Sequence, residues 1–195
     1  MKYERTKVSD GKMLYHLTAL DNIESIIEKG LLCREIITPV TDVADEEIIE
    51  KRKTLGLLSY VPFHFFAKNP FDGAVIKAYP ETKFVYLTVY RLDAEKNNWK
   101  IIPRHPLKCD TKEIYTYNDG IIKMDWELIN QRDYSNSDSK FACMAECLVY
   151  EKLDISDIRF IDVKEQADAN LIIGLLKTQK VMQAPQIRVN PNFFV

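Results

Sequence analysis

The chain has 195 residues, of which 46% are hydrophobic and 11% aromatic, and its net charge is −2. That length suits one domain with a sizeable core, residues 1–195, and the apolar content is too high for a disordered chain. The near-neutral charge excludes a globally basic nucleic-acid-binding protein, although a local basic groove is still compatible with it. No stretch resembles a secretory signal or the roughly 18 apolar residues of a spanning helix, so we expect a cytoplasmic protein with no membrane segment.

The cysteines favour a reducing compartment and no metal site. Four cysteines in this length are too few for a disulfide scaffold. Cys143 and Cys147 form a C-x3-C pair, but no second pair of cysteines or histidines completes a zinc-binding set. We therefore expect reduced thiols that partly fill the core.

The N-terminal segment predicts a compact strand, helix and turn. Residues 13–17 form a predicted strand that ends in the polar Thr18. Asp21 is expected to cap the following helix, with Glu24 three residues later as in a capping box. Gly30 then ends the helix, in the position where a left-handed backbone favours glycine.

The middle of the chain predicts a charged helix and two strands. Residues 41–55 place acidic side chains before basic ones, which suits the dipole of a helix. Residues 57–66 are β-branched and aromatic, and residues 83–91 alternate cleanly, so both are predicted strands. Between them, the Asn-Pro and Asp-Gly pairs of residues 67–73 indicate a turn or loop.

The C-terminal half predicts a series of short elements. These are a turn or short helix at 93–98, an irregular segment at 101–117, a helix at 126–129, a polar loop at 131–140, strands at 141–150 and 158–163, a helix at 168–177 and an edge strand at 187–189. Short strands dominate the whole chain. We therefore expect an α+β domain with a mostly antiparallel, split or packed sheet and two or three flanking helices.

Two polar side chains stand out as candidates for chemistry. His16 lies beside Thr18 where a strand ends, a place at which polar groups can meet a ligand, although a lone strand histidine is more often a packing residue. Glu146 lies in an apolar strand, where a carboxylate costs desolvation free energy unless it is paired or functional. Met144 and Leu148 flank Glu146 on one strand face, which favours a ligand-facing position over a solvent-facing one.

An aromatic segment, residues 60–71, is the third feature. Its rings would fill a core, and they would equally line a pocket that stacks a flat ring. Core packing is the better expectation for most of them. Phe71, which follows Asn69 and Pro70 in the predicted loop, is the ring most expected to be exposed.

These features, in this order, resemble the DarT family of NAD-dependent DNA ADP-ribosyltransferases, and more broadly the ADP-ribosyltransferase fold. The resembling segments are YHLTALDNIESIIEKGLL (15–32), the charged helix with Arg52, VPFHF (61–65) followed by KNPF (68–71), DWELINQRDY (125–134) and AECLV (145–149). They span nearly the whole chain. The opening motif recurs in distant relatives with other reactions, but its combination with VPFHF and AECLV is more specific.

The resemblance implies roles for residues on the NAD side of a cleft. His16, Leu17 and Thr18 would bind NAD, with Leu17 contributing its backbone. Asn22 and Ser25, in the following helix, are further candidates for the same site. NAD is the expected co-substrate, and no metal is implied.

The resemblance also implies a catalytic pair. Residues 36–54 would correspond to the element that covers NAD, with Arg52 as a catalytic and NAD-binding arginine. Glu146 would be the catalytic glutamate, and residues 119–141 would form the substrate-recognition loop. A carboxylate near the ribose stabilises the positive charge that develops as the nicotinamide bond breaks.

The nucleic-acid side of the cleft departs from the family pattern. Lys68, Asn69, Phe71 and Tyr134 are the expected contacts to an unstacked base. The family often has Pro-Arg-Ser-Pro-Met where this chain has residues 67–71, so NAD chemistry is the safer inference.

The implied function is transfer of ADP-ribose from NAD to a base of single-stranded DNA, as the toxin of a toxin–antitoxin pair with a macrodomain antitoxin. Alternatives are an enzyme of the same fold that acts on protein or RNA, including an RNA 2′-phosphotransferase, and a non-catalytic module that binds NAD or nucleic acid. The basic segment with Lys100, Arg104, Lys108 and Lys112 against Asp110 predicts weak, salt-sensitive and local nucleic-acid binding.

Overall fold

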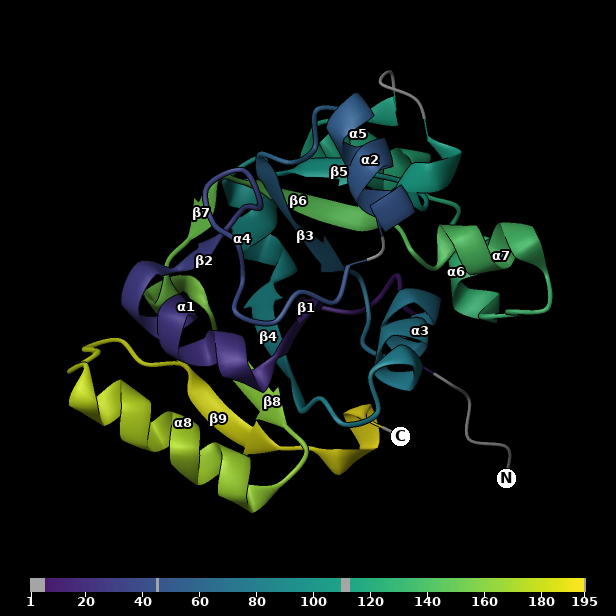
Figure 1. Ribbon diagram of the computed structural model, residues 1–195. Coiled ribbons are helices and arrows are strands. Elements are labelled where there is room, and N and C mark those ends of the chain that lie inside the picture. Colours follow the sequence, from purple (N-terminus) through teal and green to yellow (C-terminus); the bar gives the residue numbers. More distant parts are fainter. Residues whose placement is uncertain (1–5, 45, 110–112, 195) are drawn as a thin grey trace.

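The computed structural model describes residues 6–44, 46–109 and 113–194 and shows an α+β fold (Figure 1). Its strands are β1 (Met13–Ala19), β2 (Leu31–Leu32), β3 (Tyr60–His64), β4 (Phe84–Tyr90), β5 (Lys100–Ile102), β6 (Glu146–Tyr150), β7 (Lys152–Leu153), β8 (Phe160–Val163) and β9 (Gln186–Val189). Seven strands form one sheet in the order β5-β6-β3-β1-β4-β8-β9, and β2 pairs with β7 separately. Only the β8–β9 pair of the described strands is parallel, so the expectation of a mostly antiparallel sheet is confirmed.

Helices are more numerous than expected. The described α-helices are α1 (Ile23–Lys29), α2 (Glu46–Thr54), α3 (Pro70–Ala78), α4 (Arg91–Lys96), α5 (Tyr117–Lys123), α6 (Trp126–Gln131), α7 (Ser137–Ala142) and α8 (Gln166–Thr178). The expectation of two or three helices was therefore wrong, because most of these helices are only six to nine residues long and carry little periodic pattern. No helix in the part of the chain that the structure describes is long and apolar enough to cross a membrane.

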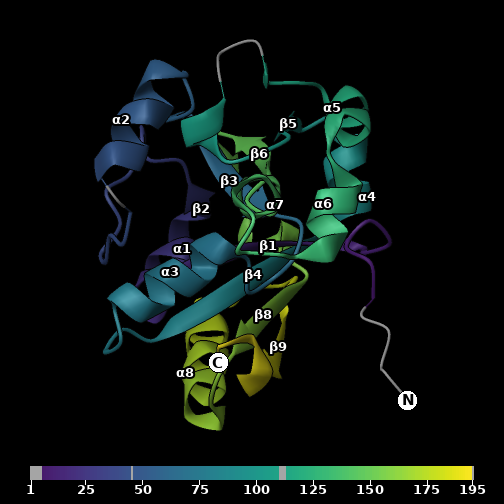
Figure 2. The same cartoon turned by 90° about the vertical axis from the view of Figure 1, so that its right-hand side faces the viewer.

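The sheet separates two groups of helices (Figure 2). Helices α1, α2 and α3 lie on one side of it, and α4, α5 and α6 lie on the other. Helix α8 packs beside β8 and β9 at one end of the sheet. The main core includes fully buried side chains such as Phe63, Leu87 and Ile161 from the central strands, so burial of these strands holds the layers together.

The start of the first helix differs from the prediction. Asp21 lies within a short 3-10 turn, Leu20–Asn22, and α1 begins at Ile23. Neither element has a side-chain cap: Ala19, before the 3-10 turn, has no acceptor, and Oδ1 of Asn22, before α1, accepts from the N–H of Thr41 instead. The end is as predicted: Gly30 has φ of 87°, and a Cβ there would lie 2.5 Å from Cε of Lys152.

The predicted loop at 67–73 is instead the beginning of α3. The side-chain oxygen of Asn69 accepts hydrogen bonds from the backbone N–H groups of Phe71 and Asp72. Pro70 occupies the first turn, where a missing N–H costs nothing. The Asn-Pro pair is therefore a helix cap, which the same two residue types can form as readily as a turn.

Two further predictions in the C-terminal half were wrong in part. The polar loop at 131–140 contains the start of α7, which Asn136 caps by accepting from the N–H groups of Asp138 and Ser139. The strand expected from residue 141 consequently begins only at Glu146. The irregular segment at 101–117 contributes the edge strand β5, while the edge position predicted for residues 187–189 is confirmed by β9. Asp45, Asp110 and Lys112 lie outside the described residues.

Candidate active site

Three neighbouring strands bring the candidate residues to one pocket. In the sheet, His64 at the end of β3 lies directly opposite Glu146 at the start of β6, and Tyr15 of β1 pairs with His64. His16 follows on β1. Because antiparallel neighbours run in opposite directions, the last residue of one strand meets the first residue of the next. The sheet therefore places two chain segments that are 82 positions apart in contact.

A pocket lies beside these strand ends and is lined in part by α1, α2 and α3. Its walls come from β1, α1, the segment 30–44, α2, the segment 57–64, α3 and the separate residues His105 and Glu146. Most of the lining is apolar, and its polar side chains include Arg52, Glu146 and the three histidines. This combination of apolar walls and a few converging polar groups is typical of a small-molecule site.

Arg52 and Glu146 form a buried ion pair in this pocket. Nη1 of Arg52 donates to Oε2 of Glu146 at 2.6 Å, and the two residues are 9% and 5% exposed. Nη2 of Arg52 also donates to the backbone oxygens of Leu57 and Tyr60, at 3.4 Å each. The guanidinium is thus held by three acceptors, and it fixes one carboxylate oxygen of Glu146 while the other, Oε1, stays available.

All three histidines of the chain line the pocket. Nδ1 of His16 lies 2.8 Å from the backbone oxygen of Pro62, so that nitrogen carries the proton. Burial lowers the pKa of His16 to about 4, which makes the ring neutral near pH 7 with Nε2 as an acceptor. His105 accepts from the N–H of Leu107 through Nδ1, and burial also lowers its pKa, so its Nε2 is a donor.

His64 completes this polar group. Its Nδ1 donates to the backbone oxygen of Ala145 at 3.1 Å, and its ring lies 5.6 Å from the ring of Phe71. Despite these histidines and Glu146, no group of three or more His, Cys, Asp or Glu within residues 6–44, 46–109 and 113–194 is arranged to hold a metal ion. The site therefore offers acid–base and hydrogen-bonding groups around the Arg52–Glu146 ion pair.

Asn22 ties the segment that covers the pocket to the strand below it. Its Nδ2 donates to Oγ1 of Thr18 and to the backbone oxygen of Thr41, and its Oδ1 accepts from the N–H of Thr41. The side chain is buried, so each lost bond would leave a polar group without a partner. Asn22 thus holds Thr41 over the same strand end that carries His16.

A comparison with known protein families assigns the chain to one of them. Residues 15–195 match the family model described as "ssDNA thymidine ADP-ribosyltransferase, DarT". The chain belongs to the DarT family. The resemblance to the DarT family that the sequence segments indicate is therefore confirmed.

Solved structures of this family share the fold. The chain superposes on Thermus sp. 2.9 DarT in complex with ADP-ribosylated single-stranded DNA with a TM-score of 0.80 at 19% identity, covering 95% of this chain and 97% of that one. The same protein in complex with NAD+ gives a TM-score of 0.78 at 19% identity, covering 95% of this chain and 98% of that one. At this identity the similarity establishes the fold.

One relative of known function joins a transferase and a glycohydrolase in a single polypeptide. It is the DNA ADP-ribosyl transferase–DNA ADP-ribosyl glycohydrolase fusion protein of Thermosipho africanus, 24% identical over 200 residues. The match covers 93% of this chain and 49% of that protein, so the chain spans about half the length of the relative.

The residues predicted for the NAD side come together in the structure. His16, Leu17, Thr18, Asn22, Ser25, Arg52 and Glu146 all line the pocket. The side chain of Leu17 also packs against the apolar cluster around Tyr86, on the opposite strand face from His16. That arrangement suits a backbone contribution from Leu17 to the pocket.

The residues predicted for the nucleic-acid side are more dispersed. Phe71 lines the pocket, half-buried against His64 rather than exposed as expected. Asn69 is 1% exposed, and its side chain caps α3, so it positions Phe71 and is not a surface contact. Lys68 is exposed next to it, with φ of 61°. Tyr134 is 42% exposed and lies outside the pocket lining.

His64 and His105 belong to the site although the sequence pattern did not predict them there. His64 lies in the quoted VPFHF segment, and its register opposite Glu146 depends on strand pairing that is not local in sequence. His105 lies in a segment predicted to be irregular. The backbone N–H of His105 donates to the backbone oxygen of Phe141, a contact between distant positions. His64 lies within the predicted strand 57–66 and His105 within the segment 101–117, and neither position carries a local signal that points to Glu146.

Proposed function

We propose that this protein transfers ADP-ribose from NAD to thymidine bases of single-stranded DNA and releases nicotinamide. The observation that carries the proposal is the buried pair of Arg52 and Glu146 in a pocket with His16, all within a chain of the DarT family. The fold relatives in complex with NAD+ and with ADP-ribosylated single-stranded DNA support it.

The lining of the pocket suits NAD. Its apolar walls can enclose flat rings, and the tilted pair of Phe71 and His64 provides an aromatic surface near Glu146. Neutral His16 and the hydroxyl of Thr18 supply hydrogen-bonding groups for a ribose or an amide. These groups would orient the sugar relative to Glu146, which is a positioning effect.

Glu146 would stabilise the transition state. As the bond between C1′ of the ribose and the nicotinamide nitrogen breaks, its electron pair leaves with nicotinamide and positive charge develops on the sugar. A carboxylate that is already fixed by Arg52 and shielded from water stabilises that charge without reorganising. The free oxygen Oε1 is available to a ribose hydroxyl.

The acceptor base must approach the other face of the sugar. The imide nitrogen of thymidine forms the new bond to C1′ and loses its proton in the same step, since a neutral imide is a poor nucleophile. The proton would pass to the free carboxylate oxygen of Glu146, and Arg52, which is already protonated, would assist by holding that carboxylate in place. A base can reach the pocket only when it is unstacked, which explains a preference for single strands.

The biological setting follows from the same family. We infer that the protein acts as a toxin in the cytoplasm, where NAD and DNA are both present, and that the residues 1–195 act as one domain. A partner that removes ADP-ribose from DNA, expected to be a macrodomain, would act as the antitoxin, since the Thermosipho africanus relative joins a glycohydrolase to its transferase.

The test is incubation with NAD labelled in the adenylate phosphate and with oligonucleotides that contain a single type of base. We expect label only on single-stranded DNA that contains thymidine, with weak labelling of the matched duplex. Label on protein or RNA alone would overturn the choice of DNA. No label on any acceptor, with no release of nicotinamide, would favour a non-catalytic binding module.

A further inference from the structure

A second ion pair lies in the wall of the pocket, in the segment that covers it. Both Nη atoms of Arg34 donate to the two carboxylate oxygens of Asp42, and Nη2 lies 2.8 Å from Oδ1. Both residues belong to the pocket lining, with side chains 32% and 35% exposed. This pair is separate from the catalytic pair of Arg52 and Glu146, and the proposed mechanism does not use it.

The pocket has no unpaired positive charge among its described lining residues with which to bind an anionic ligand. Among the described lining residues, the Lys and Arg side chains are Arg34 and Arg52, and the Asp and Glu side chains are Asp42 and Glu146. Each arginine is paired with one carboxylate, so these pairs cancel. A dinucleotide brings two negative charges on its pyrophosphate into this largely apolar pocket, where unpaired charge is costly.

Arg52 cannot easily meet this requirement. Its Nη groups donate to Glu146 and to the backbone oxygens of Leu57 and Tyr60, and a shift toward a phosphate would release a buried carboxylate. Arg34 is different, because its partner Asp42 is partly exposed and can be rehydrated when the pair opens.

The backbone around Arg34 is fixed, so its side chain is presented at a defined place. The N–H of Cys33 donates to the oxygen of Glu151, and the N–H of Glu35 donates to the oxygen of Leu58, which lines the pocket. A guanidinium held in this way can offer two parallel N–H groups to a phosphate, as it now does to Asp42.

We propose that Arg34 binds the pyrophosphate of NAD, and that Asp42 occupies its guanidinium until the dinucleotide displaces it. The inference rests on the proposed function, since it assigns a phosphate subsite within the same pocket. Asp42 is then a competitor of the ligand as well as a partner of Arg34. This competition gives the two residues opposite effects on affinity.

The test measures binding of ADP-ribose by calorimetry, which needs no turnover. We expect Arg34→Met to weaken binding on the order of tenfold to a hundredfold, the value of a charge-assisted hydrogen bond or two. We expect Asp42→Asn to strengthen binding severalfold, because the amide no longer competes with phosphate for the cation. A purely structural clasp predicts that both variants weaken binding by a similar factor.

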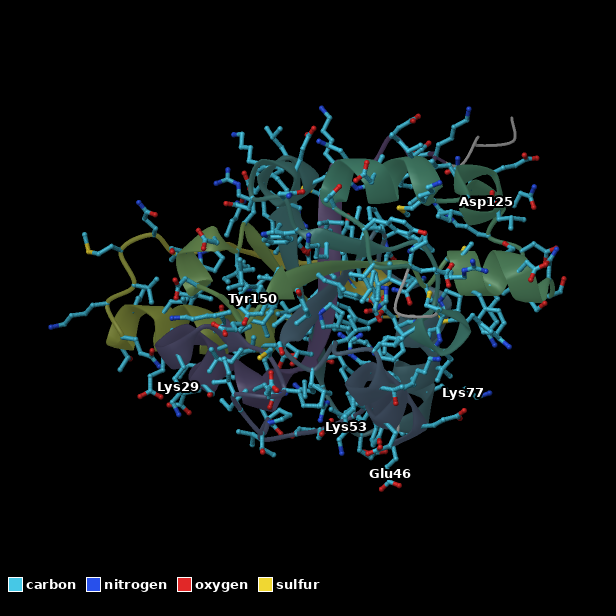
Figure 3. The ribbon with its side chains drawn as sticks, turned by 90° about the horizontal axis from the view of Figure 1, so that it is seen from above. Lys29, Glu46, Lys53, Lys77, Asp125 and Tyr150 are labelled. Atoms are coloured by element: carbon cyan, nitrogen blue, oxygen red, sulfur yellow. The ribbon has the colours of Figure 1, made fainter. Side chains whose placement is uncertain are left out.

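Two controls separate the outcomes. Lys29→Met removes an exposed cation at the end of α1, at the outer edge of the molecule (Figure 3), and should leave binding unchanged. Nicotinamide riboside, which has no phosphate, should bind Arg34→Met as it binds the unsubstituted protein. Equal affinity of Arg34→Met and the unsubstituted protein for ADP-ribose overturns this inference. Failure of the unsubstituted protein to bind ADP-ribose or NAD overturns the proposed function instead.

Discussion

Replacement of Glu146 by Gln tests the proposed catalytic role of the Arg52–Glu146 pair most directly. The amide has nearly the same shape, and its oxygen can still accept the hydrogen bond that Arg52 now gives at 2.6 Å. What the substitution removes is the negative charge. The sugar of a bound NAD would then develop its positive charge beside a neutral group and a cationic Arg52.

The expected effect can be worked from this geometry. Two unit charges about 4 Å apart interact by about 4 kcal/mol at an effective dielectric constant of about 20. Loss of that stabilisation slows the reaction by roughly a thousandfold, since each 1.36 kcal/mol corresponds to about tenfold in rate. Stability should fall as well, because Arg52 is 9% exposed and keeps only backbone acceptors and an amide. We expect a loss of about 1–3 kcal/mol, which is less than the cost of deleting one partner of a buried pair.

The assay is a single-turnover measurement with saturating NAD and a thymidine-containing oligonucleotide, together with thermal melting of the same samples. Glu28→Gln is the matched control, since that side chain is 63% exposed at the end of α1 and lies outside the pocket lining. It should retain full rate and melting temperature. A folded Glu146→Gln protein that keeps more than a tenth of the rate would refute the electrostatic role assigned to Glu146.

Three other outcomes follow from the site. Asn22→Ala should raise the KM for NAD about tenfold with little change in kcat, because it releases Thr41 and the covering segment; a fall in kcat alone would contradict this. His16 should stabilise the folded protein more at neutral pH than in acid, because its pKa in the folded state, about 4, lies below the ordinary 6.5. Its contribution to the free energy of unfolding, up to about 3 kcal/mol, is complete above pH 6.5 and is lost as the pH falls toward 4. Denaturation of His16→Gln across that range should show a shallower pH dependence, and an unchanged slope would exclude His16 as the source. Phe71→Ala should raise the KM for the oligonucleotide or for NAD by about tenfold. Tyr134 lies outside the pocket, so Tyr134→Ala should raise the KM for the oligonucleotide only if the bound DNA extends that far. Titration of each substrate at a saturating level of the other shows which KM changes.

Some errors in the predicted elements have a common physical cause. Asn69 and Asn136 were interpreted as loop residues, and both cap short helices. Asparagine and proline favour turns and helix starts for the same reasons, namely a side-chain acceptor and a fixed backbone angle. Which of the two forms depends on whether the following residues find a surface to pack against. That surface consists of residues far away in the chain.

The start of α1 also depends on a contact with a distant residue, which a local pattern does not reveal. Asp21 satisfied the local capping pattern, yet Asn22 makes the decisive bonds, and two of them reach Thr41. A local rule could identify a helix and its end at Gly30. It could not detect that a side chain near the helix start had a tertiary partner in a covering segment.

The sequence by itself determined the strands of highest alternation, the stop at Gly30 and the segments that carry the family resemblance, because these depend on neighbours a few positions apart. It also identified Glu146, since a carboxylate among apolar residues is conspicuous wherever the strand lies. The tertiary structure alone decided that Arg52 is the partner of that carboxylate and that His64 and His105 share its pocket. Those contacts join residues separated by about 40 to 90 positions, and they form only when antiparallel strands set their register. The net charge of −2 does not reveal the two ion pairs of this pocket, Arg52 with Glu146 between distant parts of the chain and Arg34 with Asp42 within the covering segment.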